Sequence, residues 1–158
     1  MKTKLIVFGF CLAAIASSGD EKRSLYPDKK LTPGAKDPHV TQATIHKTVC
    51  VVGYTATVRN VPESMKKEVM RRYGLPQTEL HQVEIDHLIS LENGGSNEIE
   101  NLWPEYYEPK PGARQKDAVE TALHRDLCAG KITLEEDQKI LTGDWLKEWK
   151  KRFGDTAK

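Results

Sequence analysis

Residues 83–105 of the chain read VEIDHLISLENGGSNEIENLWPE, and this stretch decides the fold. Asp86 directly precedes His87, and Asn101 follows the histidine after fourteen positions. Between them, residues 93–95 are Asn-Gly-Gly, which tolerate the positive φ angles of a tight turn. We expect a strand over 82–86 that continues extended through 88–91, then a turn and a short return strand at 100–103. The stretch therefore predicts a hairpin with His87 on one strand and Asn101 on the other.

A helix should follow this hairpin. Residues 104–112 contain three prolines and two tyrosines and are typical of a loop. Residues 113–129 place Val119, Leu123 and Leu127 on one apolar stripe, and Gly130 supplies a helix end. The middle of the chain is therefore predicted to run strand, turn, strand, loop and helix.

The flanking segments predict additional elements. Residues 44–60, TIHKTVCVVGYTATVRN, are rich in Thr and Val, and we expect one or two short strands with a turn at Gly53. Residues 61–74 show apolar side chains at helical spacing between Pro62 and Gly74, which favours a short amphipathic helix. Residues 133–136, Thr-Leu-Glu-Glu, form a capping box that opens the last helical region.

Residues 1–16 have the pattern of a secretory signal peptide. A short basic head precedes an uncharged apolar run over 5–13, and Ala14-Ile15-Ala16 is a small-x-small cleavage signature. The alternative, a membrane anchor, needs about 20 apolar residues, and this run is shorter. Residues 17–38 are polar and predict a flexible lead-in, which leaves one domain over 39–154. We expect an exported protein, periplasmic or secreted, with no membrane span after cleavage.

Two cysteines, Cys50 and Cys128, remain after the predicted cleavage. An even count in an oxidising compartment favours one disulfide, and two buried free thiols are the alternative. Such a bridge would tie the N-terminal part of the domain to the helix over 113–129. The sequence has no Cys-x-x-Cys pair, so a structural zinc knuckle is not expected.

Bulk charge gives no support for a nucleic-acid partner. The chain has 24 Lys and Arg against 23 Asp and Glu, a formal net charge of +1. Basic side chains gather at 66–72 and 147–152, and such runs on helices are usually solvated faces. Any polynucleotide would therefore have to be held by local contacts.

The central stretch resembles the HNH endonuclease family. DHLISLENGGSNEIENLW, residues 86–103, has the Asp-His, Gly-Gly and Asn-Leu pattern of that family. TVCVVGYTATVR at 48–59 and KDAVETALHRDLCAGKITLEE at 116–136 resemble a subgroup of small exported HNH-like proteins, so the likeness spans residues 40–150. The resemblance implies a ββα-metal core, a hairpin and helix that grip one divalent ion. We expect an α+β fold with this core, additional N-terminal strands and a helix, and C-terminal helices.

The chemistry of phosphodiester hydrolysis assigns roles to the hairpin residues. The reaction needs a base that takes a proton from water, and an imidazole titrates near neutrality, so His87 is the expected general base. The resemblance implies that Asn101 hydrogen-bonds the backbone or ring of the histidine and fixes its orientation. It also implies that Asp86 reaches the metal ion.

The chain departs from the family at the start of the helix. The resemblance implies a metal ligand at the position of Ala113, which has no ligand atom. Asp117, Glu120 and His124 follow on one helix face and are candidate ligands in its place. The alternative is that the two acids pair with neighbouring arginines and that His124 packs or caps the helix.

Two cations near the start of the same helix, Arg114 and Lys116, are candidate contacts for a substrate phosphate. The alternative is that both are solvated side chains.

These expectations describe a monomeric, metal-dependent endonuclease that cuts DNA or RNA with little sequence preference. The divalent ion is expected to be Mg²⁺, with Mn²⁺, Ca²⁺ and Zn²⁺ as alternatives. The rival interpretation is an exported interaction module that keeps the hairpin and has lost the chemistry. The missing ligand at Ala113 and the near-neutral charge favour that rival.

Overall fold

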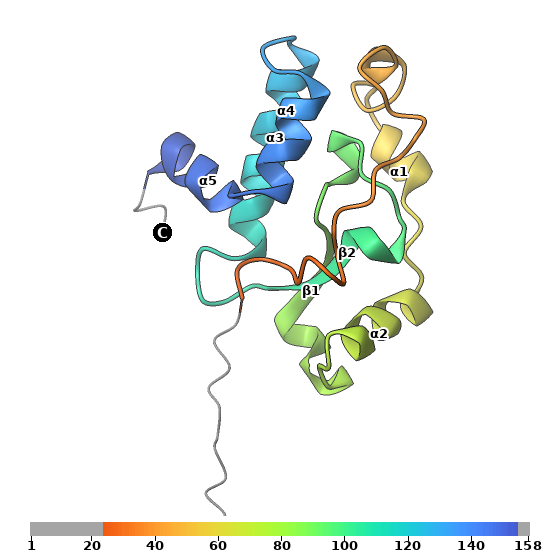
Figure 1. Ribbon diagram of the computed structural model, residues 1–158, viewed down its shortest axis with the longest axis vertical. Coiled ribbons are helices and arrows are strands. Elements are labelled where there is room, and N and C mark those ends of the chain that lie inside the picture. Colours follow the sequence, from red (N-terminus) through yellow and green to blue (C-terminus); the bar gives the residue numbers. More distant parts are fainter. Residues whose placement is uncertain (1–23, 155–158) are drawn as a thin grey trace, which may run out of the picture.

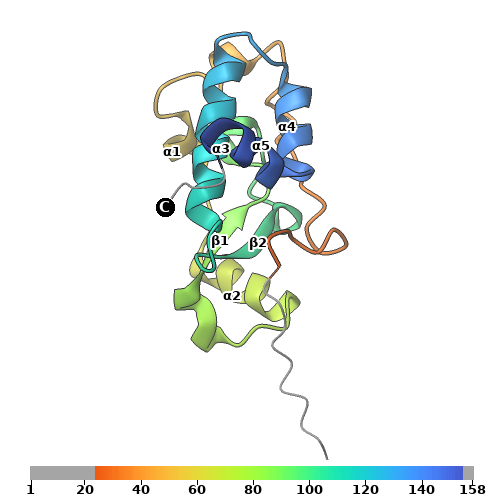
Figure 2. The same ribbon diagram turned by 90° about the vertical axis from the view of Figure 1, so that its left-hand side faces the viewer.

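The computed structural model describes residues 24–154, which form an α+β fold. The sheet lies between α2 on one side and α3, α4 and α5 on the other (Figures 1 and 2). The helices and strands are α1 (Tyr54–Val58), α2 (Glu63–Arg72), β1 (Val83–His87), β2 (Leu102–Tyr106), α3 (Ala113–Cys128), α4 (Leu134–Thr142) and α5 (Trp145–Phe153). Short 3₁₀ turns connect them: η1 (Ile45–Lys47), η2 (Gln77–Gln82), η3 (Leu91–Asn93) and η4 (Ile99–Asn101).

The signal peptide predicted at residues 1–16 lies outside the described residues. Among residues 24–154, no helix has the length and apolar character needed to cross a membrane.

The hairpin forms with β1 antiparallel to β2. Asp86 pairs with Trp103 and His87 with Leu102. The strand prediction for this region is confirmed, but the extension through 88–91 is wrong, because the chain bends at residues 88 and 89 and η3 begins at Leu91. β2 in turn runs to Tyr106, three residues into the expected loop, and includes Pro104. A two-stranded sheet consists only of edges, where a residue without an N–H is tolerated.

Residues 44–60 do not form the predicted strands. They form η1 and α1, with Gly53 at φ 83° before the first residue of α1. Ile45 and Val49, four positions apart, are buried against Leu127 and Leu134. Burial at this spacing suits a helical turn, and it outweighs the strand preference of Thr and Val because residues 24–154 offer this segment no partner strand.

The helix predicted over 113–129 is confirmed as α3, and its apolar stripe enters the core. Val119 and Leu123 pack with Leu141, Trp145 and Trp149 of the two following helices. The capping box before α4 is also present, since the Thr133 side chain accepts from the Glu136 N–H at 3.2 Å. α3 therefore links the hairpin to the C-terminal helices.

The N-terminal part of the described chain is linked to the hairpin and to α3. The predicted disulfide is present, between Cys50 and Cys128 at the end of α3. Residues 24–38, expected to be a flexible lead-in, contact the hairpin: buried Thr32 donates to the Leu102 carbonyl at 2.8 Å, and Lys36 pairs with Gly95. The N-terminal segment thus contacts both β2 and the loop between the two strands.

Gly95 is required by close approach of the backbone. A Cβ at this position would lie 1.8 Å from the Ile89 carbonyl oxygen and 2.7 Å from Nδ2 of Asn101. No side-chain rotation relieves a contact with a backbone oxygen, so the loop could not close around a larger residue.

We therefore expect Gly95→Ala to lower the free energy of unfolding by more than about 4 kcal/mol, measured by guanidinium unfolding followed through tryptophan fluorescence. Gly130→Ala is the matched control. Gly130 has φ 69° and open space around it, so it should lose only about 1–2 kcal/mol of backbone strain energy. Equal losses for the two variants would contradict the close approach at Gly95.

Candidate functional site

His87 lies at the end of β1, and its ring contacts Asn97. Nε2 of His87 is 3.3 Å from Oδ1 of Asn97. The Asn97 amide is fixed in turn, because Oδ1 accepts from the Asn60 N–H at 3.1 Å and Nδ2 donates to the Val58 carbonyl at 2.8 Å. Since an amide oxygen only accepts, Nε2 carries the proton, and the lone pair of the neutral ring lies on Nδ1.

His87 is also buried, with 1 % of its surface exposed. Burial lowers the pKa of His87, because the charged ring would lose its hydration, and the nearby Asp86 charge only partly opposes this effect. The ring is therefore neutral at neutral pH, which is the form that accepts a proton.

Asn101 supports the loop that follows the histidine. Its side-chain oxygen accepts from the Ile89 N–H at 3.0 Å, and its Nδ2 donates to the carbonyls of Ile89 at 2.9 Å and Ser96 at 2.8 Å. Its own carbonyl accepts from the Leu88 N–H at 2.7 Å. Asn101 thus orients the backbone one and two residues beyond His87, while Asn97 contacts the ring.

Lys116 is the centre of a buried charged cluster. Its side chain is 0 % exposed, and its Nζ donates to Oδ2 of Asp86 at 2.6 Å, to the His87 carbonyl at 2.9 Å and to Oε1 of Glu120. Oε2 of Glu105 is 3.9 Å from the same nitrogen. An ammonium group has three donors, and all three are used.

The cluster holds three carboxyl groups but one basic group, and the pKa shifts of its members reduce this excess of negative charge. Burial would lower the pKa of Lys116, but Asp86, Glu120 and Glu105 raise it well above its usual value. Burial would raise the pKa of Asp86, but Lys116 lowers it. Burial raises the pKa of both Glu105 and Glu120 well above the usual range, more than Lys116 lowers it. The stable state is an ammonium–carboxylate pair of Lys116 and Asp86 with two acids that favour their neutral form.

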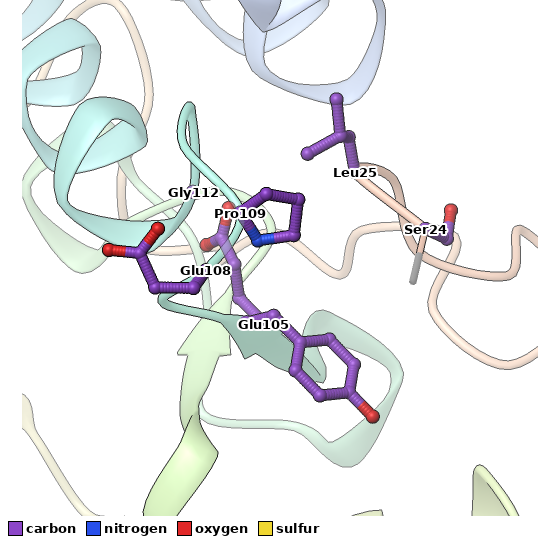
Figure 3. Close-up of a pocket in the computed structure, with 7 residues that line it drawn as sticks. Ser24, Leu25, Glu105, Glu108, Pro109 and Gly112 are labelled. Atoms are coloured by element: carbon purple, nitrogen blue, oxygen red, sulfur yellow. The ribbon is translucent and has the colours of Figure 1, made fainter. Parts of the chain in front are cut away.

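Glu105 brings β2 into this cluster. It is 2 % exposed, and its carboxyl group lies close enough to Asp86 for the Asp86 charge to raise the pKa of Glu105. Figure 3 shows it in the wall of a small pocket, about 10 Å³, between the N-terminal segment at Ser24 and Leu25 and the loop at Glu108 and Pro109. This space corresponds to one water molecule.

The four metal ligands expected from the sequence do not converge on a common point. Asp86 and Glu120 approach each other, but the Lys116 ammonium lies between them. His124 points elsewhere: its Nε2 donates to the Val49 carbonyl at 3.0 Å, and its Nδ1 is 3.8 Å from Oε2 of Glu92. A divalent cation does not fit between Asp86 and Glu120, because it would repel the lysine charge at close range.

Asp117 lies on the outer side of α3, near a second acid on β1. The pKa of exposed Asp117 is raised by lost hydration and by the charge of Asp86. The pKa of half-buried Glu84 is raised by burial, by Asp86 and by Asp117. Arg59 is close enough to lower the pKa of Glu84, Asp117 and His87. These carboxylates raise one another's pKa, but their oxygens would need side-chain movement to share a cation, since among residues 24–154 the donor atoms that converge within 4.8 Å are those of Cys50, His124 and Cys128.

An open groove of about 390 Å³ adjoins these groups. Arg59, Lys66, Glu84 and Tyr107 supply its polar side chains, and Val61, Leu80, Val83 and Ile85 complete its lining. Arg114, a predicted phosphate contact, stands over the Tyr107 ring at 5.9 Å and is exposed. Lys116, the other predicted phosphate contact, is buried in the cluster and cannot reach a substrate without leaving it.

Two residues that matter for this arrangement, Asn97 and Glu105, had no assigned role in the sequence because they carry no motif. Lys116 was assigned to a substrate phosphate, and its central position in the buried cluster depends on contacts between elements. One available signal was the four-residue spacing of Lys116 and Glu120, which places both on one helix face.

Comparison with known proteins identifies no relative: no protein-family model, no curated protein and no solved structure matches the chain.

We expect Lys116→Met to lower the free energy of unfolding by about 3–5 kcal/mol at pH 7, because it leaves the Asp86 carboxylate buried and unpaired. The loss should shrink as the pH falls toward 4. The lysine lowers the pKa of Asp86, so the ion pair stabilises the fold at pH values above the usual pKa of an aspartate. At lower pH the Asp86 carboxyl of the variant can take up a proton, and a neutral acid costs less to bury than an unpaired charge.

Guanidinium unfolding at pH 4 and pH 7 measures both effects. Lys139→Met, at an exposed lysine of α4, is the matched control and should leave the free energy of unfolding unchanged at both pH values. A loss for Lys116→Met that is equal at both pH values would show that the pair with Asp86 is not its cause.

Proposed function

We propose that the protein is a metal-dependent nuclease that hydrolyses phosphodiester bonds of DNA or RNA. The observation that carries the proposal is the position of a neutral His87 beside Glu84, Asp86, Asp117 and Arg59, close enough for their charges to act on one another. Together they supply a base, oxygen ligands and a cation for phosphate. The resemblance of residues 86–103 to the HNH endonucleases supports the same chemistry.

His87 is the proposed general base. Its Nδ1 has the free lone pair, because Nε2–H donates to Asn97. Its lowered pKa keeps the ring unprotonated at neutral pH, so it can take a proton from an attacking water. The ring is 1 % exposed, so substrate entry requires the segment 58–60, which hydrogen-bonds the Asn97 amide, to move aside.

Glu84 and Asp117 are the proposed metal ligands, next to Asp86. They replace the set that included Glu120 and His124, which the Lys116 ammonium and the Val49 contact hold away. A divalent ion bound there would neutralise charge on the phosphate and lower the pKa of a bound water. Lys116 keeps the Asp86 carboxylate ionised and fixed at the inner edge of this site.

The groove beside Glu84 is the proposed path of the polynucleotide. Arg59 and Lys66 can each pair with a phosphate, and Tyr107 offers a ring to a base or sugar. Two cations give few phosphate contacts, so binding should be weak and sensitive to salt.

A second candidate function is a non-catalytic interaction module built on the same hairpin. Two observations favour it: Lys116 holds the space between Asp86 and Glu120, and the His87 ring is closed to solvent. In this alternative the buried ammonium takes the structural place of an ion, and the chain has no hydrolytic activity.

Purified protein incubated with supercoiled plasmid and Mg²⁺ or Mn²⁺ should convert it to nicked circles, and chelation should abolish the reaction. His87→Ala should lower the rate at least 100-fold, the usual contribution of a general base. Asp117→Asn should raise the metal concentration needed for half-maximal activity, because it removes one charged ligand.

His46→Ala, at an exposed histidine of η1, is the control and should retain full activity. Absence of nicking with every metal would favour the interaction module. Nicking that survives His87→Ala unchanged would place the activity elsewhere or in a contaminant.

A further inference from the structure

We propose that the reduced protein binds one zinc ion through Cys50, His124 and Cys128, at a site separate from His87. The Sγ atoms of the two cysteines and one ring nitrogen of the histidine lie within 4.8 Å of one another. Ligand atoms of a tetrahedral zinc ion lie about 3.5 Å apart, given bond lengths of about 2.0–2.3 Å. Small side-chain rotations therefore bring the three donors onto one ion.

A backbone hydrogen bond fixes the tautomer of the histidine. Nε2–H donates to the Val49 carbonyl at 3.0 Å, so in the neutral ring the lone pair lies on Nδ1. A metal-binding histidine usually donates its other N–H to a backbone carbonyl or carboxylate in this way. Oε2 of Glu92, 3.8 Å from Nδ1, lies outside the group of converging donors, so a water molecule completes the four-coordinate site.

The donors stay together without the disulfide, because other contacts hold the segment around Cys50. Ile45 and Val49 are each 2 % exposed and pack against Leu127, the residue before Cys128. The Cys50 N–H donates to the Ile45 carbonyl at 2.9 Å. Reduction therefore frees the two sulfurs while the core keeps them near each other.

Two thiolates and an imidazole select a borderline-soft ion, and this distinguishes the site from the oxygen ligands near His87. The disulfide and the metal exclude each other. Reduction breaks the Sγ–Sγ bond, with a dithiol reductant supplying two electrons and two protons and becoming a disulfide itself. Zinc then binds the two thiolates and the neutral ring, and the two thiol protons are released.

The segment around Cys50 can therefore be cross-linked to α3 in two ways, by the zinc ion or by the disulfide. In a reducing compartment the ion would link the segment at Cys50 to α3, and after oxidation the disulfide makes the same link. The chain could thus hold this contact before and after it meets an oxidising environment.

Cobalt absorption tests the proposal without any assay of hydrolysis. The full chain carrying Cys11→Ser leaves Cys50 and Cys128 as its two thiols. After reduction with a phosphine, one equivalent of Co²⁺ should produce thiolate-to-cobalt charge-transfer absorption, and one equivalent of Zn²⁺ should remove it. The oxidised protein should give no such band.

His124→Ala should weaken cobalt binding at least tenfold, whereas His46→Ala, at an exposed histidine, should leave it unchanged. Far-ultraviolet circular dichroism of each reduced sample tells whether the chain is folded. The proposal is overturned if the folded, reduced protein gives no charge-transfer band, or if His124→Ala binds cobalt as tightly as His46→Ala. A reduced chain that loses its native dichroism and does not regain it with zinc also overturns it.

Discussion

The buried ammonium of Lys116 is the interaction on which the arrangement of the hairpin and α3 depends. It joins β1 through Asp86 and the His87 carbonyl, approaches Glu105 of β2, and bonds Glu120 on its own helix. A buried cluster of this kind adds little net stability over apolar packing, but it has only one geometry in which every donor is used. It therefore sets where α3 meets the sheet, and with it the position of Asp117 relative to β1.

This constraint divides the acids of the site into two groups. Asp86, Glu105 and Glu120 face the ammonium, and the last two favour their neutral form. Glu84 and Asp117 lie on the outer side, where their charges repel and a cation would be stabilising. The same lysine excludes an ion from the inner side and keeps the Asp86 carboxylate ionised beside the two outer acids. The proposed function depends on this division, since a nuclease of this type needs an ion beside its base.

Much of the hairpin and α3 could be predicted, because their signals are local. Asn93 to Gly95 mark the turn, and the spacing of Val119, Leu123 and Leu127 marks the helix. The segment 44–60 was misjudged for the opposite reason: its helical turns are stabilised by burying Ile45 and Val49 against α3 and α4, which are distant in sequence. In the site, Asp86 and His87 could be identified by motif, whereas the contact of Asn97 with the ring follows from how a loop folds back over β1.

By itself the sequence determined the α+β class, the order of strand, strand and helix, the disulfide, and the need for small residues at the turn, because these depend on neighbouring residues or on the number of cysteines. The tertiary structure alone decided which partner each charged side chain found. Lys116 could be read from sequence as a surface cation, and His124 as a ligand beside Glu120. Their true neighbours come from elements up to 75 positions away, such as Val49 for His124. Burial and packing between distant segments select those contacts, and no local pattern encodes them.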